Sequence, residues 1–246
     1  MLMPFGLYVV TPDCDDDGWL AAAVAAAVRG GASSIQYRHK RAGAGQRLRQ
    51  ARRLAEVCRA QSVPLIVNDS PEVAREAAAH GVHLGREDGD PVAARRLLGD
   101  GLLIGVSCYD ELERAQRWRE VADYVAFGAV FSSSVKPAAV RAPLSLFEQA
   151  RREGFGHAGS ERAGSEDAGF RATGDTPRPA LVAIGGITAD NAAPLASAGI
   201  DAIAVISAVF GDGSGDPDRC EARARRVCAA FEGGLADPTG SGPARD

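Results

Sequence analysis

The chain has 246 residues, of which 46% are hydrophobic, so it is long enough to build one α/β barrel around a sizeable core. Its formal net charge is −4, and no basic balance points to nucleic acid or to an anionic membrane as a partner. It starts with no signal-peptide pattern and has no membrane-spanning apolar run, and its 5 cysteines favour packing thiols, so we expect a cytoplasmic protein.

Short apolar segments alternate along the chain with Ala/Leu/Arg-rich segments of helical character. Near-continuous apolar strands are typical of a parallel sheet that helices cover on both faces. We expect strands at 7–11, 34–37, 64–68, 81–84, 103–107, 124–131, 181–185 and 202–207. We expect helices at 19–29, 46–60, 71–79, 91–98, 111–120, 144–152, 189–198 and 220–231. Because the strands close at eight, the sequence predicts an α/β fold, a single (β/α)8 TIM barrel, with an open doubly wound sheet as the alternative.

Two segments differ from this pattern. Residues 154–178 are rich in Gly, Ala, Ser and charge, without an apolar period, and we expect a flexible surface insertion there. Residues 233–246 have a similar composition and are expected to form a disordered tail. The catalytic barrel domain is therefore expected to occupy residues 1–232.

In barrels of this kind the active site lies at the C-terminal ends of the strands, so polar residues that follow the apolar runs are candidates. Gln36, Arg38 and Lys40 lie at the end of the second run and just after it, and the period of two places them on one side of the chain. Two cations and an amide are costly to bury without an anion, which favours an anion site there. The alternative is that these side chains point into solvent.

Asp69 and Asp88 follow neighbouring strands, the third and the fourth. Two carboxylates at adjacent strand ends are suited to Mg²⁺, a hard ion that substrate phosphate often completes. The alternative for Asp69 is a helix-capping role before Pro71. Glu87 and Asp90 compete with Asp88 for the second ligand position.

Three further features are weaker on their own. Gly185-Gly186 and Ile206-Ser207 follow the last two strands, where barrels often bind a monophosphate, although an ordinary turn also fits. Lys136 and the serines before it suit a phosphate, although a flexible serine-rich loop fits as well. His83 lies among apolar residues, and a hydrogen-bonded core histidine is favoured over a catalytic base.

Together these residues resemble the thiamine-phosphate synthase family of (β/α)8 enzymes. The motifs appear in family order from about residue 5 to residue 210, and together they are specific. They are Gln36-Tyr37-Arg38-His39-Lys40, Val67-Asn68-Asp69, Val82-His83-Leu84-Gly85-Arg86-Glu87-Asp88, Gly105-Val106-Ser107, Gly128-Ala129-Val130-Phe131 with Lys136, Ala183-Ile184-Gly185-Gly186-Ile187-Thr188 and Val205-Ile206-Ser207-Ala208.

The resemblance implies a role for each matching position. A pyrimidine diphosphate would be bound by Gln36, Tyr37, Arg38, His39, Lys40, Asn68, Ser107 and Lys136. A thiazole phosphate would be bound by Ser133, Ser134, Val135, Gly186, Ile206 and Ser207. Asp69 and Asp88 would hold one Mg²⁺ per subunit, and Arg38, Lys40 and Lys136 would be the catalytic cations.

The resemblance also implies a reaction in which pyrophosphate leaves first and the thiazole nitrogen then attacks a pyrimidine-methyl cation. The partners would be small phosphorylated molecules, and the sequence leaves a homo-oligomer open. Val135 stands where the family pattern has a threonine, which removes one hydroxyl from the thiazole side. Two other functions stay open: a thiazole tautomerase on the same barrel, and a non-catalytic barrel that senses phosphate.

Overall fold

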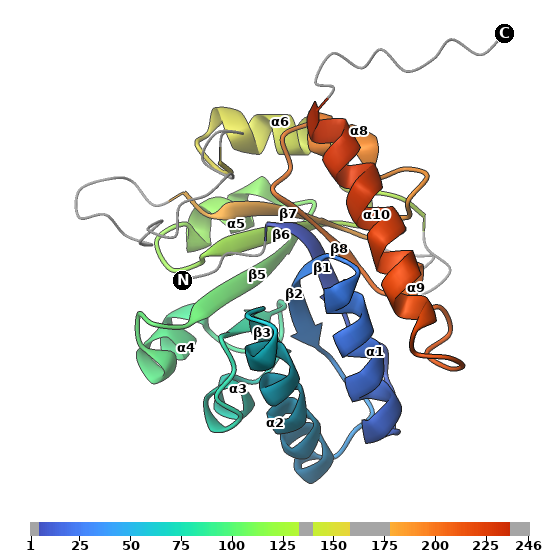
Figure 1. The fold of residues 1–246 in the computed structure, drawn as a ribbon. Helices are drawn as coiled ribbons and strands as arrows, with labels where there is room; N and C mark the ends of the chain where they lie inside the picture. The colour runs from blue at the N-terminus through green and yellow to red at the C-terminus, as the bar shows by residue number, and fades with distance from the viewer. Residues whose placement is uncertain (1–4, 133–139, 158–177, 237–246) are drawn as a thin grey trace, which may run out of the picture.

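The strands close into one parallel barrel. The structure is a computed structural model and describes residues 5–132, 140–157 and 178–236. Each strand pairs with the next in chain order, and β8 pairs with β1 to complete the ring, as Gly6 beside Ala202 illustrates (Figure 1). The strands are β1 (Gly6–Val10), β2 (Ala32–Tyr37), β3 (Leu65–Asn68), β4 (Gly81–Leu84), β5 (Leu103–Tyr109), β6 (Tyr124–Gly128), β7 (Ala180–Ile184) and β8 (Ala202–Val205). The predicted eight-stranded barrel is confirmed.

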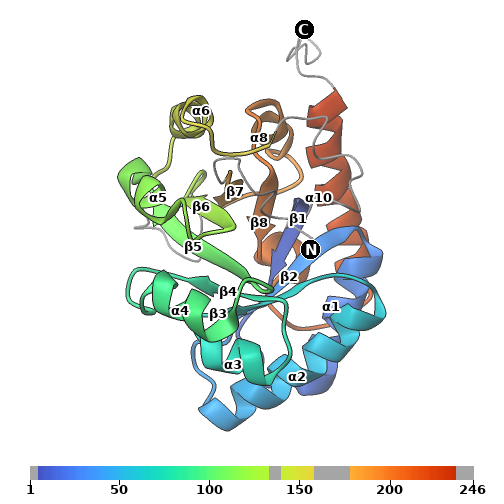
Figure 2. The same ribbon diagram turned by 90° about the vertical axis from the view of Figure 1, so that its left-hand side faces the viewer.

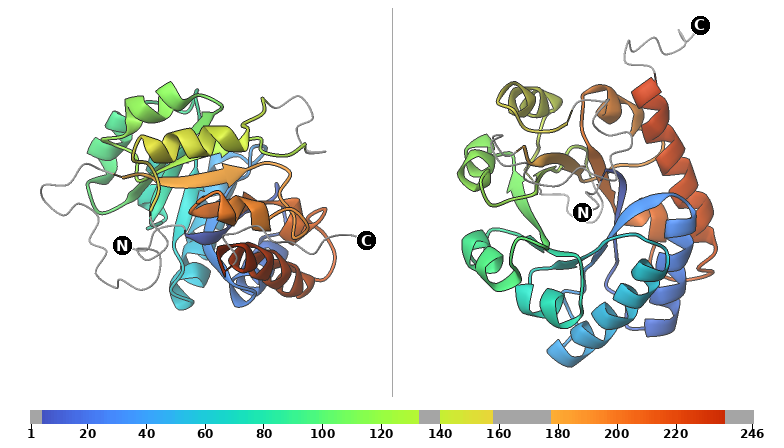
Figure 3. Two further views of the ribbon diagram at one scale, coloured as in Figure 1. Left: turned by 90° about the horizontal axis from the view of Figure 1, so that it is seen from above. Right: turned by 60° about the vertical axis from the view of Figure 1, so that its left-hand side comes forward.

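The helices lie outside this ring, one after another around the strands (Figure 3). They are α1 (Asp17–Arg29), α2 (Ala44–Ala60), α3 (Pro71–Glu76), α4 (Pro91–Leu98), α5 (Leu112–Trp118), α6 (Leu144–Arg152), α8 (Ala193–Ser197), α9 (Ser207–Phe210) and α10 (Arg219–Ala236). Figure 2 shows α1, α2, α3 and α4 in succession along one side of the molecule. None of the helices in the described ranges is long and apolar enough to cross a membrane.

Local sequence explains where several helices begin. Asp16 caps α1 by accepting from the backbone N–H groups of Gly18 and Trp19. Asp90 caps α4, and Pro91 follows as the first helical residue. The helix expected at 189–198 is shorter, because Asn191 bonds the turn after β7 and α8 starts only at Ala193.

Two predicted boundaries differ from the structure. The helix α10 continues to Ala236, four residues into the expected tail, and it packs between α1 and α8. The expected insertion starts later than residue 154, because Phe155 is buried beneath the guanidinium of Arg119. The N–H group of Gly156 also donates to the carbonyl of Pro179. The rest of the expected insertion and of the expected tail, residues 158–177 and 237–246, lies outside the described residues.

The strands separate two buried layers. Residues such as Leu7, Val9 and Ile35 point outward and pack against the helices in the larger apolar cluster. Tyr8 and Tyr124 belong to a smaller cluster inside the barrel. This alternation decides which residues of a strand can reach the barrel mouth.

Candidate active site

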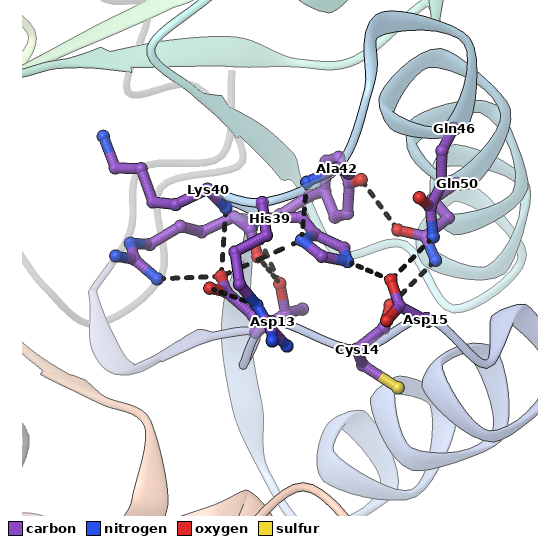
Figure 4. Close-up of polar contacts among 12 residues, drawn as sticks. Asp13, Cys14, Asp15, His39, Lys40, Ala42, Gln46 and Gln50 are labelled. Atoms are coloured by element: carbon purple, nitrogen blue, oxygen red, sulfur yellow. Dashed lines mark hydrogen bonds and ion pairs between the residues drawn. The ribbon is translucent and has the colours of Figure 1, made fainter.

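The backbone that carries Arg38 and Lys40 is held by two residues that follow β1. The hydroxyl of the buried Thr11 accepts from Arg38 N at 2.8 Å and donates to Arg38 O at 3.0 Å. Asp13 Oδ1 accepts from Lys40 N at 3.0 Å and from Arg38 Nη1 at 3.1 Å. Figure 4 shows Asp13 at the centre of these contacts. The two cations therefore leave the end of β2 in a fixed arrangement.

Tyr37 and His39 point away from this pair. Tyr37 is buried under α2, and its hydroxyl donates to Gln50 Oε1 at 2.8 Å. The His39 ring is buried, its Nδ1 accepts from Ala42 N, and its Nε2 lies 3.1 Å from Asp15 Oδ1 (Figure 4). The resemblance implied a binding role for both residues, but the period of two puts their side chains in the helical layer. They stabilise the segment, and we leave them out of the proposed binding site.

Asp69 lies directly after β3 and forms an ion pair with Lys40. Its backbone is in the left-handed region, with φ at 68°, which is uncommon for a residue other than glycine. Ser70, not Asp69, caps α3, because its hydroxyl accepts from Val73 N. The capping alternative for Asp69 is therefore wrong, and its carboxylate is turned towards the cation instead.

Asp88 is the carboxylate of its loop that turns towards Asp69. Its Oδ2 accepts from Gly85 N at 2.8 Å, and a Cβ on Gly85 would lie only 2.6 Å from that oxygen. Of its two competitors, Asp90 is engaged in capping α4, and Glu87 is exposed. Burial, and then the neighbouring Asp69 carboxylate, raise the pKa of Asp88 above its ordinary value. A cation placed between the two carboxylates would relieve this repulsion.

A cavity of about 510 Å³ opens beside these charges. It is lined by Lys40, Arg86, Glu87, Asp88, Tyr109, Asp110, Glu111 and Val140. Within the described ranges, no group of three or more His, Cys, Asp or Glu side chains is placed to hold a metal ion. Mg²⁺ is commonly bound through only one or two carboxylates, with water and substrate phosphate as the other ligands. Two converging carboxylates beside an open cavity therefore fit this ion.

Ser107 lies on the interior side of β5, and Asn68 ends β3. The Ser107 hydroxyl lies 2.8 Å from His83 Nε2, and the other ring nitrogen of His83 lies 3.0 Å from the Tyr124 hydroxyl. His83 is thus the hydrogen-bonded core histidine that the sequence favours. Burial lowers its pKa from 6.5 to about 4, so the ring is neutral at pH 7.

The predicted thiazole side is described only in part. Ser133, Ser134, Val135 and Lys136 lie outside the described residues. Gly186 has φ at 65°, and a Cβ there would lie 2.4 Å from Ser132 O, so the turn after β7 packs closely on the segment leading to those residues. Ile206 and Ser207 follow β8, at the start of α9.

Sequence reasoning did not find Thr11 and Asp13. Both lie at the end of the first apolar run, so the criterion of polar residues at strand ends could have identified them. Their partners lie 25 to 27 residues away along the chain, which no local pattern reveals.

Comparisons with known proteins point to one family. The profile of a family described as thiamine monophosphate synthase matches residues 7–156. Over 206 residues the chain is 51% identical to a protein of Aromatoleum aromaticum named thiamine-phosphate synthase, covering 83% of this chain and 88% of that one. Its identity to the protein of the same name from Chromobacterium violaceum is 47% over 227 residues, covering 92% and 96%.

A solved structure also resembles this chain. The thiamine phosphate pyrophosphorylase from Pyrococcus furiosus superposes with a TM-score of 0.72 at 28% identity, covering 94% of this chain and 98% of that one. A second one, from Bacteroides thetaiotaomicron, has a TM-score of 0.63 at 13% identity, covers 92% and 98% of the two chains, and bears on the fold alone. With a profile match over more than half of its length and relatives of this identity, the chain belongs to the thiamine monophosphate synthase family.

Proposed function

We propose that this chain is a thiamine-phosphate synthase. It joins a pyrimidine-methyl diphosphate to a thiazole phosphate and releases pyrophosphate, as a transferase of thiamine biosynthesis. The observation that carries the proposal is the meeting of Lys40, Asp69 and Asp88 beside one open cavity at the barrel mouth. The names of the relatives that share about half of its residues support the same reaction.

The reaction requires charge stabilisation rather than a nucleophilic side chain. The bond between the methylene carbon and the diphosphate oxygen breaks, and both electrons leave with the diphosphate. The lone pair of the thiazole nitrogen then forms the new bond to that carbon. Negative charge grows on the leaving group, and fixed cations lower the barrier most when they are already in place. Arg38 and Lys40 are such cations: Asp13 holds the Arg38 guanidinium and the backbone N–H of Lys40, and Asp69 pairs with the Lys40 ammonium.

Asp69 and Asp88 are the residues that would hold Mg²⁺. When bound, this ion supplies positive charge to the diphosphate oxygens. Lys40 pairs with Asp69 in the structure, so the ammonium group lies next to the metal ligands. From there it can bind an oxygen of the departing diphosphate. We infer that Gln36, Asn68 and Ser107 bind the pyrimidine diphosphate, with Lys136 as a third cation.

The thiazole phosphate is proposed to bind on the far side of the mouth, at Gly186, Ile206 and Ser207. Ser133, Ser134 and Val135 complete this proposed set. Gly186 has no Cβ, so the turn after β7 packs against the backbone of Phe131 and Ser132, which precede the serines of this set. Holding both substrates in one mouth shortens the path of the attacking nitrogen and adds a proximity effect.

We place this reaction in the cytoplasm, with small phosphorylated molecules as partners. All five cysteines are free thiols, which fits a reducing compartment. A second copy of the chain as a partner is a separate hypothesis, which ultracentrifugation of the purified protein tests.

The deciding experiment mixes the purified chain with both substrates and Mg²⁺ and follows pyrophosphate and thiamine phosphate together. The proposal predicts equal amounts of the two products. A chain that isomerises the thiazole but releases no pyrophosphate would be the tautomerase. A chain that binds phosphate without turnover would be the sensing barrel.

A further inference from the structure

A chain of buried hydrogen bonds crosses the interior of the barrel. Gln36 Nε2 donates to the Tyr8 hydroxyl at 2.7 Å, and the Tyr8 and Tyr124 hydroxyls lie 2.8 Å apart. Tyr124 continues to His83 Nδ1 at 3.0 Å, and His83 Nε2 reaches the Ser107 hydroxyl at 2.8 Å. The five residues come from five different strands, so the chain runs across the barrel beneath its mouth. Both of its ends are residues of the proposed pyrimidine site.

The side chains that make these hydrogen bonds pack tightly inside the barrel. Tyr8 and Tyr124 are 1% and 0% exposed, and their rings meet edge to face. The Tyr124 ring occupies space that only a glycine leaves open. A Cβ on Gly105 would lie 1.9 Å from Tyr124 Cζ.

The hydrogen bonds from Gln36 to Ser107 all run in one direction, from donor to acceptor. Burial raises the pKa of both phenols, so each keeps its hydrogen and must donate it. Tyr8 accepts from Gln36, so it donates to Tyr124, and Tyr124 in turn donates to Nδ1 of His83. Neutral His83 then carries its hydrogen on Nε2 and donates it to Ser107. The opposite direction needs the Gln36 amide turned over, with its oxygen towards Tyr8.

This direction fixes what the two ends offer to a ligand. The side-chain N–H of Gln36 donates to Tyr8. Its carbonyl oxygen therefore points away from these hydrogen bonds and can accept one from a ligand. Ser107 accepts from His83, so its own hydrogen is available as a donor. An aminopyrimidine has both an amino donor and ring-nitrogen acceptors, and it complements such a pair.

We propose that Tyr8, Tyr124 and His83 are positioning residues that make Gln36 an acceptor and Ser107 a donor towards the pyrimidine ring of the substrate. The inference rests on the proposed function for the identity of the ligand. The direction of the hydrogen bonds is a property of the protein alone. The two parts can therefore be tested separately.

The direction is measured first, by ¹⁵N NMR of the imidazoles in the full, unliganded chain at pH 7. Substitution of His83→Gln assigns its signals among the four histidines. We expect a neutral ring with the hydrogen on Nε2 and a bare Nδ1. A ring with its hydrogen on Nδ1, or a charged ring, overturns the proposal. This result does not depend on any turnover.

The effect on the substrate is measured next, with Tyr124→Phe. We expect the KM for the pyrimidine diphosphate to rise about tenfold, as for one lost hydrogen bond, and the KM for the thiazole phosphate to stay within about twofold. Nδ1 of His83 should also lose the signature of a hydrogen-bonded acceptor. An unchanged KM for the pyrimidine diphosphate, or an equal rise for both substrates, overturns the positioning role. Tyr8→Phe cuts the same chain and serves if Tyr124→Phe does not fold.

Asp201→Asn is the matched control for loss of stability. Asp201 is also buried, but it bonds Leu181 N at the opposite end of the barrel, where β8 begins. It should lower the melting temperature and leave both KM values unchanged. If the wild-type chain releases no pyrophosphate at all, the proposed function fails. The imidazole signals still decide the direction of the hydrogen bonds in that case.

Discussion

Lowering the pH from 7.5 to 5 should destabilise this protein, and His83 should make a measurable contribution. In the unfolded chain its imidazole binds a proton below its ordinary pKa of 6.5, whereas in the folded barrel burial lowers that pKa to about 4. The unfolded state therefore binds more protons between these two values, and acid shifts the equilibrium towards it. The stability that His83 contributes is complete above pH 6.5 and is lost as the pH falls towards 4.

The size of the effect follows from the pKa difference. A shift from 6.5 to about 4 corresponds to about 3 kcal/mol in total. Between pH 7.5 and pH 5 about 2 kcal/mol of this should disappear, because most of the unfolded chains are protonated by then. Such a loss is a large fraction of the usual stability of a folded domain.

The assay is urea unfolding of the wild type and of His83→Asn at both pH values. Other groups titrate equally in both proteins, so the difference between the two pH dependences isolates His83. We expect the wild type to lose about 2 kcal/mol more than the variant. If the two stabilities fall in parallel, the reasoning is refuted. An NMR titration of the His83 ring in the wild type checks the same point without a mutation.

Three further predictions concern the mouth and the core. Asp69→Asn should lower kcat about 100-fold at limiting Mg²⁺ with little change in melting temperature, and full activity would remove Asp69 from the metal site. Asp13→Asn should raise the KM for the pyrimidine diphosphate about tenfold in steady-state assays, because it removes the charge that holds the Arg38 guanidinium, and an unchanged KM would contradict this. Gly105→Ala should lower the free energy of unfolding in urea by about 2 kcal/mol or more, because the new Cβ meets Tyr124. Gly101→Ala is the control, since a Cβ there has open space, and an equal loss of stability in both variants would refute the packing argument.

The sequence was sufficient for the barrel because strands buried on both faces leave a clear apolar signal. It was insufficient where two roles share one local pattern. Asp69 and Ser70 both precede Pro71, and only the structure shows that Ser70 is the cap. The same holds at Asp88, whose competitor Asp90 caps the next helix.

Other parts of the site depend on contacts that are distant in sequence. Tyr8 and Tyr124 are 116 residues apart, and neither has a neighbour that marks it as part of a polar chain. Tyr37 is a different case, because alternation along β2 already separates it from Gln36. The resemblance grouped them as one motif, and the physical pattern divides that motif into an interior face and a helical face.

The central claim is that a cationic mouth with two carboxylates takes up a leaving diphosphate. Calorimetric titration of the purified chain with inorganic pyrophosphate, with and without Mg²⁺, tests it most directly. We predict binding that depends on Mg²⁺, that is lost in Asp88→Asn, and that weakens in Lys40→Ala. Pyrophosphate binding of equal strength in all three proteins, with or without the ion, would contradict the account.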